Sequence, residues 1–287
     1  MNPLPSPNQG GASTRGGRFV LPPPPAGLSD ATAPAWFDIV ADRLLNRLRL
    51  HVAGRPHRLT EVEAYVHAPD HPDPFPHRHP IQSTPGRWYF HRTHGAYRGG
   101  SFKGVDVSVG RGPACGGFLL RGLVTPDGTA IDGPSLLVDY LLSGTGFGTV
   151  AKLDAALGET PAWDADSPLS LRPAAAEPRL VLSGLRVGLS LKRQGREAVG
   201  YLFRRYRYLT DPRQTKKGKP QMVLPLLADG VSVEEVNVLT GCPPAAVKRY
   251  AVAFATGRNA EPHFGPDLNT TDLCRLYGWW CERGILT

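Results

Sequence analysis

The pattern of apolar and polar positions predicts three strands in the first half of the chain. Residues 59–66, LTEVEAYV, alternate with a period of two, as a half-buried β-strand does. One face of this strand carries Leu59, Glu61, Glu63 and Tyr65. The runs FKGVDVSVG (102–110) and GGFLLRGLV (116–124) alternate in the same way and predict two further strands of one mixed sheet. A strand with two carboxylates and a tyrosine on one face is typical of a functional surface.

Helical spacing of apolar residues occurs on both sides of these strands. Residues 35–52 place apolar side chains at positions such as Phe37, Ile39 and Val40, which predicts a helix. Residues 131–142 predict a turn and a second helix that begins near Pro134. We expect two more strands in residues 179–193 and 201–209, and a Pro- and Ala-rich loop in residues 160–178.

The two ends of the chain differ from its centre. Residues 1–34 are dominated by Pro, Gly and Ser and are predicted to be disordered or extended. Residues 35–210 are predicted to form the main domain, and residues 211–220 a basic linker. Residues 221–287 predict a helical extension in which Ser232 and Glu235 form a capping box and Gly241 ends the first helix. This spacing resembles a helix-turn-helix, although helical hairpins are often plain packing units.

Charge points to a polyanionic partner. The 287 residues contain 33 Lys or Arg and 25 Asp or Glu, a net charge of +8, and residues 192–219 alone contain ten basic and two acidic residues. Tyrosines and a phenylalanine lie between these cations, as on a surface that tracks phosphates and stacks bases; the alternative is a solvated edge strand protected by arginines. The candidates for contact with a nucleic-acid backbone are Arg193, Arg196, Arg204, Arg205, Arg207, Lys216, Lys217, Lys248 and Arg249.

The four cysteines are scattered without metal-site spacing, which favours reduced thiols and an intracellular protein. No apolar run approaches the length of a membrane span, and no signal peptide pattern opens the chain. We expect a soluble monomer in a bacterial cytoplasm or nucleoid, or in the nucleus or an organelle of a eukaryote.

Residues 67–80, HAPDHPDPFPHRHP, are rich in potential ligands and allow three interpretations. The histidines and aspartates could bind a metal, but the prolines exclude a helix that would align His67 with His71. The segment could be a rigid loop. It could also border a hydrolytic site, in which a carboxylate of the preceding strand activates water and stabilises a cationic sugar in the transition state.

Several motifs, taken in order, resemble those of the alkyladenine (3-methyladenine) DNA glycosylase family, whose members flip a damaged purine out of duplex DNA. The matching segments are LLN (44–46), TEVEAY (60–65), TP (84–85), LLRGL (119–123), GPSLLVDYL (133–141), LRVGL (185–189) and YLFR (201–204). The resemblance spans residues 36–209 and implies an α+β fold with a largely antiparallel, curved sheet and flanking helices.

The resemblance also implies roles for individual residues. Glu63 matches the catalytic general base, whereas Glu61 matches a carboxylate that is not the base. Tyr65 matches a tyrosine that stacks on the flipped base, and Arg121 an arginine that lines the pocket. His77 matches the histidine that contacts the base after an insertion of about three residues, so that His71 remains an alternative.

The chain departs from the family in the aromatic stretch that starts at Tyr97, which matches a tyrosine of the family and is a further candidate for contact with the substrate. The position of a second stacking tyrosine is taken by Gly99, and that of the side chain that wedges into DNA by Lys103 or Phe102. Loss of one stacking ring removes about 1–3 kcal/mol of base binding. The resemblance therefore predicts the reaction class more firmly than the substrate.

These observations predict a monofunctional glycosylase for DNA repair by base excision, which acts on an alkylated or deaminated base in duplex DNA and needs no metal or other cofactor. Two alternatives stay open. One is a nucleic-acid-binding protein that keeps the fold without catalysis, and the other is a metal-dependent hydrolase that uses the histidine-rich loop.

Overall fold

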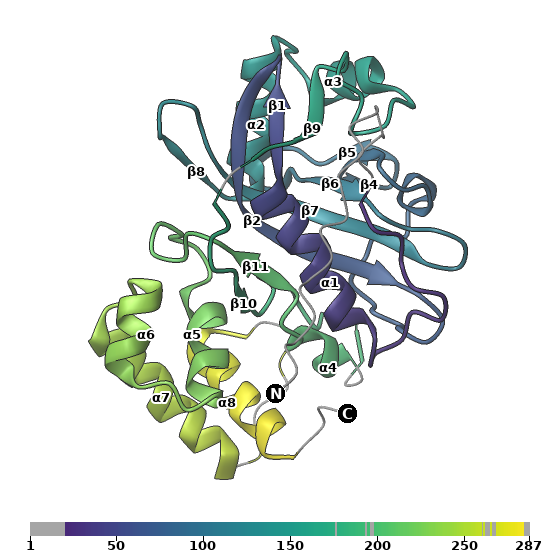
Figure 1. The fold of residues 1–287 in the computed structure, drawn as a ribbon. Helices are drawn as coiled ribbons and strands as arrows, with labels where there is room; N and C mark the ends of the chain where they lie inside the picture. The colour runs from purple at the N-terminus through teal and green to yellow at the C-terminus, as the bar shows by residue number, and fades with distance from the viewer. Residues whose placement is uncertain are drawn as a thin grey trace, which may run out of the picture.

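The protein is an α+β structure in which helices flank one large sheet (Figure 1). The computed structural model describes residues 21–175, 177–192, 194–195, 198–259, 261, 265 and 268–283. Its α-helices are α1 (Ala33–Asp42), α2 (Pro134–Thr145), α3 (Val150–Leu157), α4 (Ala198–Leu202), α5 (Lys219–Ala228), α6 (Val233–Thr240), α7 (Pro244–Asn259) and α8 (Thr270–Glu282). A π-helical turn (Arg43–Arg47) follows α1, and two short 3₁₀ turns cover Pro80–Ser83 and Gly100–Phe102.

Nine strands form the main sheet, and every pairing between them is antiparallel. The sheet comprises β1 (Leu48–Val52), β2 (Arg55–His67), β3 (Trp88–Phe90), β6 (Val105–Ser108), β7 (Cys115–Val124), β8 (Ala130–Asp132), β9 (Leu169–Pro173), β10 (Leu182–Gly184) and β11 (Arg207–Leu209). Its central order is β10-β11-β2-β7-β6-β3, and β4 (Arg92–Thr93) and β5 (Ala96–Tyr97) form a separate hairpin. The expected α+β class with a largely antiparallel sheet is confirmed.

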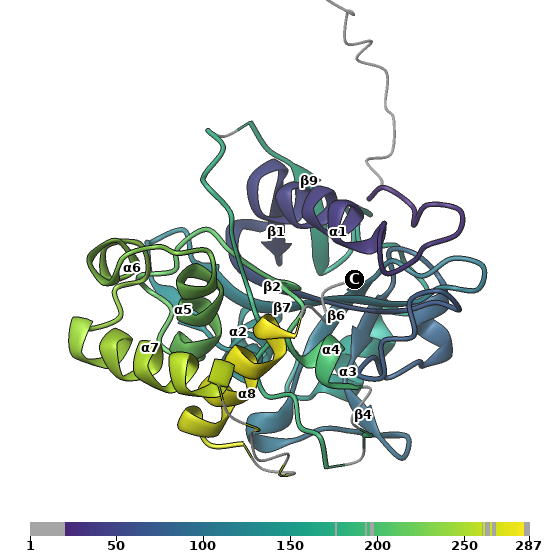
Figure 2. The ribbon, with the colours of Figure 1, turned by 90° about the horizontal axis from the view of Figure 1, so that it is seen from below.

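Alternation along β2 separates an apolar face of the sheet from a polar one. Val62, Ala64 and Val66 are buried in the main hydrophobic core, where Phe37 of α1 packs edge-on against Phe118 of β7. Figure 2 shows α1 over this face of the central strands, with α4 and α8 on the other side. The intervening residues of β2 therefore face away from α1 and are free to build a site.

The first helix is shorter than its sequence predicts. It passes into the π-helical turn after Asp42, and residues 48–52 form β1 instead of a helical end. Leu48, Leu50 and Val52 alternate with polar residues, and their burial between β2 and β9 outweighs the helical periodicity. Ile39, expected on the apolar stripe, is 52% exposed.

Two other segments also differ from expectation. Residues 169–173, predicted as loop, form β9 because they pair with β1 along its whole length. The described residues of 179–193 contribute only the three-residue strand β10, and the predicted strand at 201–209 begins instead inside the short helix α4, Ala198–Leu202. Of the second predicted strand, only Arg207–Leu209 forms a strand, β11, which pairs with β2.

The predicted tail is too long at its C-terminal end. Leu21 and Leu28 are buried in the main core, and the indole Nε1 of Trp36 donates a hydrogen bond to the Pro22 carbonyl. Residues 21–34 are therefore part of the packed structure, while residues 1–20 lie outside the described part of the chain.

The C-terminal helices form the expected extension and add two helices to the predicted pair. Ser232 and Glu235 make the capping box, and Gly241 ends α6 in the left-handed conformation, as predicted. Helices α7 and α8 pack so closely that a Cβ atom at Gly257 or Gly278 would overlap the backbone of the other helix. The extension shares a hydrophobic cluster with α4, so it packs on the main domain.

Candidate functional site

The polar face of the sheet gathers charged residues from four neighbouring strands. Glu63 of β2 lies opposite Arg207 of β11 on one side and Leu119 of β7 on the other. Leu119 in turn lies opposite Asp106 of β6. Residues paired across a sheet point to the same face, so this register brings the charged side chains together.

Two carboxylates and two guanidinium groups form the centre of the site. Arg121 Nε donates to Glu61 Oε1 at 2.5 Å, and Arg207 Nε donates to the same oxygen at 2.9 Å. Arg121 Nη1 lies 3.3 Å from Glu63 Oε2. All four side chains are buried, and their opposite charges balance.

A bulge in the sheet directs Arg121 toward both carboxylates. Glu61 lies opposite Gly122 and Val62 opposite Leu120, so Arg121 is the extra residue of β7 at this point. Bulges of this kind re-aim side chains and are common beside active sites. The irregular register therefore explains how one arginine reaches Glu61 and Glu63 together.

Electrostatics keep this cluster charged. Burial raises the pKa of Glu61, but Arg207 and Arg121 outweigh burial, so its pKa lies below the ordinary value. Burial lowers the pKa of Arg121, but Glu63 and Glu61 outweigh it and leave the pKa above its ordinary value. Arg121 therefore carries a fixed positive charge at the site.

Glu63 has no exposed surface, and each of its oxygens has a different environment. Oε1 accepts a hydrogen bond from the Val187 backbone N–H at 2.8 Å. Oε2 accepts from the Tyr65 hydroxyl at 2.9 Å and lies near Arg121. Tyr65, Arg121 and Val187, which contact the two oxygens, all line the adjoining cavity, so Glu63 lies directly behind the cavity wall.

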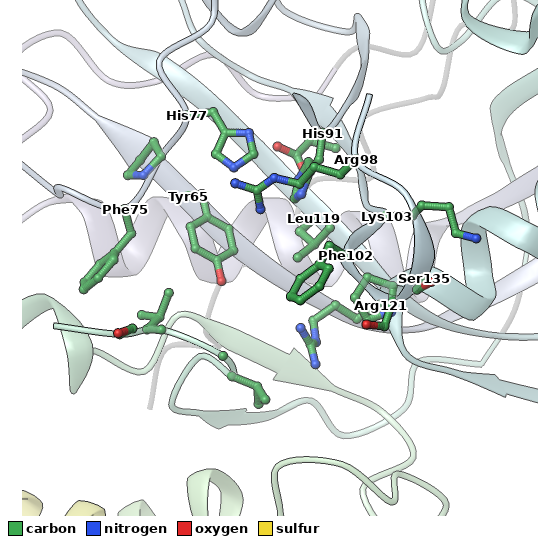
Figure 3. A pocket seen from close by; sticks show the side chains of 18 of the residues that line it. Tyr65, Phe75, His77, His91, Arg98, Phe102, Lys103, Leu119, Arg121 and Ser135 are labelled. Atoms are coloured by element: carbon green, nitrogen blue, oxygen red, sulfur yellow. The ribbon is translucent and has the colours of Figure 1, made fainter. Parts of the chain in front are cut away.

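A cavity of about 470 Å³ opens over this cluster (Figure 3). This volume is in the range of small-molecule and cofactor sites. In Figure 3, Tyr65, His77 and Phe102 point into the same space, with Arg121 beneath them. Its lining includes Tyr65, Phe75, Pro76, His77, Gln82, His91, Arg98, Ser101, Phe102, Lys103, Asp106, Leu119, Arg121, Pro134, Ser135, Val187 and Lys217.

The ring of Tyr65 is held from outside the cavity by Arg186. The Arg186 guanidinium lies 4.7 Å from the centre of the Tyr65 ring and is only 2% exposed. It donates to Asp73 Oδ2 at 2.6 Å and to the carbonyls of Ala64 and Tyr201. The Asp73–Arg186 pair thus ties the histidine-rich loop to the strand that carries Glu63.

A second polar network holds His77 at the cavity wall. His77 Nδ1 lies 2.9 Å from the Tyr89 hydroxyl, and its ring lies 4.5 Å from that of His91. His91 Nε2 and Gln82 Nε2 bind the two oxygens of Asp106, at 2.8 and 2.9 Å. Burial, and then the neighbouring His91, lower the pKa of His77 to about 4, so its imidazole is neutral at pH 7.

The depressed pKa of His77 predicts a loss of stability in acid. The ordinary histidine pKa is near 6.5, so the unfolded chain takes up a proton before folded His77 does as the pH falls. The stabilising effect is complete above about pH 6.5 and is lost as the pH falls toward 4. We therefore expect a smaller decrease in Tm between pH 7 and pH 4.5 for His77→Gln than for the wild type, measured by thermal unfolding.

The exposed His94 provides the control for this measurement. His94→Asn is expected to keep the wild-type pH dependence, since the other histidines are the same in all three proteins. Equal decreases in Tm for wild type and His77→Gln would contradict the assignment of a neutral, buried imidazole.

Two predicted substrate-binding residues lie outside the cavity. His71 has no exposed surface; its Nδ1 lies 2.6 Å from Asp30 Oδ1, and its ring packs against Phe37 and Tyr206. It is a core residue because the loop turns it toward α1, so the choice between the two histidines falls on His77. Tyr97 donates to Asp154 and receives a hydrogen bond from Arg92, which directs its hydroxyl toward α3.

The two wedge candidates both line the mouth of the cavity, in different ways. Phe102 is 74% exposed, more than any other aromatic side chain among the described residues. Lys103 donates to Asp139 of α2 at 2.5 Å.

Several residues predicted to contact phosphates are buried or form ion pairs within the protein. Arg207 is wrong as a phosphate contact, because it is fully buried on Glu61 and on the carbonyls of Lys217 and Gly218. Arg204 pairs with Asp30 and Arg205 with Asp229, so both mainly join elements of the fold. The predicted stacking residues are also buried and cannot meet bases: Tyr201, Phe203, Tyr206 and Tyr208.

The remaining basic candidates lie on the surface where the structure describes them. Lys216 and Lys217 are exposed, and Lys217 lines the cavity. Lys248 and Arg249 are exposed on α7. Arg193 and Arg196 lie outside the described residues.

The histidine-rich loop does not gather its ligand-type side chains. His71 binds Asp30, Asp73 binds Arg186, and His67 Nδ1 lies 3.2 Å from the Asp73 carbonyl. Within the described ranges, His, Cys, Asp and Glu side chains form no group of three or more that could hold a metal ion. The loop instead supplies His77 to the cavity and Asp73 to the support of Tyr65.

Several residues of the site were not singled out from the sequence. Glu63 and Tyr65 are supported by Val187, Arg186 and Asp73. The sequence features that could have indicated these residues are the LRVGL motif and the position of Asp73 inside the polar loop. His91, Arg98 and Asp106 come from strands and turns with no distinctive local pattern.

The fold and site define a mixed α+β protein whose antiparallel sheet carries a buried carboxylate–arginine centre beneath a polar cavity. The chain is 30% identical over 174 residues to the uncharacterized protein L759 of Acanthamoeba polyphaga mimivirus. The match covers 55% of this chain and 80% of the viral protein. The chain therefore belongs to the same family as this viral protein.

No family model matches the chain. None of the helices in the described part of the protein combines the length and apolar character needed to cross a bilayer.

Proposed function

We propose that the protein is a monofunctional DNA glycosylase with an alkyladenine-glycosylase-like fold, which hydrolyses the N-glycosidic bond of a damaged base flipped out of duplex DNA. The observation that carries the proposal is the position of Glu63, which lies directly behind the cavity wall with its Oε2 in contact with Tyr65 and Arg121. This arrangement combines a fixed carboxylate, an aromatic ring and a cation, as the motifs of the sequence predict.

Each group has a role in the proposed reaction. The flipped base stacks on Tyr65, and neutral His77 contacts it from the cavity wall. The Glu63 carboxylate accepts a proton from water as the water oxygen bonds to C1′ of the sugar. The bond between C1′ and the base nitrogen breaks, and the base leaves with the bonding electrons. The negative charge of Glu63 also stabilises the cationic sugar in the transition state.

The buried partners of Glu63 suit this role. Val187 and Tyr65 fix both carboxylate oxygens, so little reorganisation is needed when charge develops on the sugar. Arg121 orients the carboxylate and is itself held by Glu61, which keeps the centre balanced in charge.

The surface around the cavity supports contact with DNA. Phe102 is an exposed apolar side chain at the cavity mouth, suited to fill the gap left by a flipped nucleotide. Lys216 and Lys217 beside the cavity, and Lys248 and Arg249 on α7, are exposed cations that suit phosphate contacts.

The proposal is tested by base release from a panel of labelled duplexes, each with one alkylated or deaminated base, in a chelating buffer. We expect the purified protein to release at least one base and to leave an abasic site without cutting the strand. A protein that binds the duplexes but releases no base from any of them would instead be a non-catalytic binder. Release that requires an added metal would favour a metal-dependent hydrolase.

A further inference from the structure

The charges that face the cavity are not balanced. Its lining contains four cationic side chains and a single carboxylate, Asp106. Lys103 pairs with Asp139, and Arg121 with the two buried glutamates. Within the described residues, Arg98 and Lys217 have no ion-pair partner. Asp106 forms an ion pair with neither of them, because His91 and Gln82 bind its two oxygens, and its single charge offsets at most one of the two cations.

Arg98 is held so that its guanidinium enters the cavity. It follows the β4–β5 hairpin; its backbone N–H donates to the His91 carbonyl, and its Nε donates to Thr93 Oγ1 at 2.9 Å. Figure 3 shows the guanidinium between His77 and Phe102, above Tyr65. Its charge is among the causes that lower the pKa of His77, after burial and His91. The terminal N–H groups of Arg98 are therefore available to a ligand that stacks on Tyr65.

The aromatic ring of Tyr65 also disfavours a cationic ligand. Tyr65 already interacts with the Arg186 cation, 4.7 Å from the ring centre, which weakens the attraction of the ring for a second cation. A cationic ligand on Tyr65 would also lie beside Arg98, where like charges in a partly desolvated space repel. A neutral ligand with hydrogen-bond acceptors meets neither cost.

We propose that Arg98 is a specificity-determining residue, which selects neutral bases with carbonyl and ring-nitrogen acceptors and rejects bases with a fixed positive charge. The inference rests on the proposed function and names the substrate class of that site. Arginine donates to the adjacent O6 and N7 acceptors of 6-oxopurines, as in DNA recognition. Deaminated adenine has both acceptors and no charge, whereas N7-methylated guanine is a cation and has lost the N7 acceptor.

The test compares wild type, Arg98→Met and Arg98→Lys on duplexes that contain hypoxanthine or 7-methylguanine. We expect wild type to release hypoxanthine faster than 7-methylguanine, and Arg98→Met to reduce this preference by about tenfold or more, from the loss of one bidentate contact and of a repulsive charge. Arg98→Lys keeps the charge without the fork and is expected to continue to reject 7-methylguanine. The exposed Arg55, in the β1–β2 hairpin and away from the cavity lining, supplies the control Arg55→Met.

Equilibrium binding of the same duplexes to the Glu63→Gln protein, with and without Arg98→Met, measures the preference without catalysis. The inference is overturned if the wild type prefers 7-methylguanine. It is also overturned if Arg98→Met leaves the preference in release and in binding unchanged. In both cases the proposed function stands. Absence of base release by wild type overturns the proposed function. The ratio of the affinities for the two duplexes then still tests the role of Arg98. A preference for hypoxanthine that depends on Arg98 supports this role, and equal affinities contradict it.

Discussion

Replacement of Glu63 by Gln is expected to lower the rate of base release by about 10³-fold, within the range contributed by general acid–base catalysis. The amide cannot take the proton of the attacking water and provides no negative charge for the cationic sugar. The amide NH2 group also meets a donor in either orientation, because the Val187 N–H faces Oε1 and Arg121 Nη1 faces Oε2. The measurement is single-turnover release from the best duplex of the panel.

Glu61→Gln is the matched comparison for this substitution. It removes a carboxylate from the same charge cluster, 2.5 Å from Arg121 Nε, but not the one that contacts Tyr65. Both variants are expected to lose stability, by about 1–3 kcal/mol for each unsatisfied buried donor. Only Glu63→Gln should lose most of its activity under conditions in which both remain folded. An equal loss of activity in the two variants would show that the cluster acts structurally and that Glu63 is not the base.

Asp73→Ala is expected to reduce the free energy of unfolding by about 3–5 kcal/mol, the cost of removing one partner from a buried ion pair. Both Asp73 and Arg186 are buried, and their 2.6 Å contact is the only ion pair of Arg186 among the described residues. Without Asp73, the guanidinium is left buried with two carbonyls as its only hydrogen-bond partners among the described residues. Urea unfolding at equilibrium measures the change as a lower midpoint.

Two further variants separate the ion pair from the loop. Asp70→Ala removes an exposed carboxylate of the same loop and is expected to change stability by less than about 0.5 kcal/mol. Addition of Arg186→Met to Asp73→Ala removes the unpaired charge and should restore at least about 1 kcal/mol. If the double variant is no more stable than Asp73→Ala alone, the burial of an unpaired charge is not the cause.

The strands of the sheet centre could be predicted because their pattern is local. In β6, and in β2 and β7 outside their irregular register near Glu61 and Arg121, residues that point to the core alternate with residues that point away, and this period of two is visible in a single segment. The capping box of α6 and the glycine that ends it are local in the same sense. Residues 48–52 and 169–173 could not be assigned, because the two segments become strands by pairing with each other across more than a hundred residues.

The sequence by itself determined that Glu61, Glu63 and Tyr65 share one face of a strand, because side chains alternate along a strand, and the motif singled out Glu63 as the proposed base. Only the tertiary structure decided what surrounds them. Arg207 leaves the predicted DNA-binding surface and balances Glu61, because its register in β11 places it opposite Glu63. His77 reaches the cavity and His71 the core, because the loop between them is held by the distant Arg186. A charge can be counted in a sequence, but its partner depends on contacts between segments far apart in the chain.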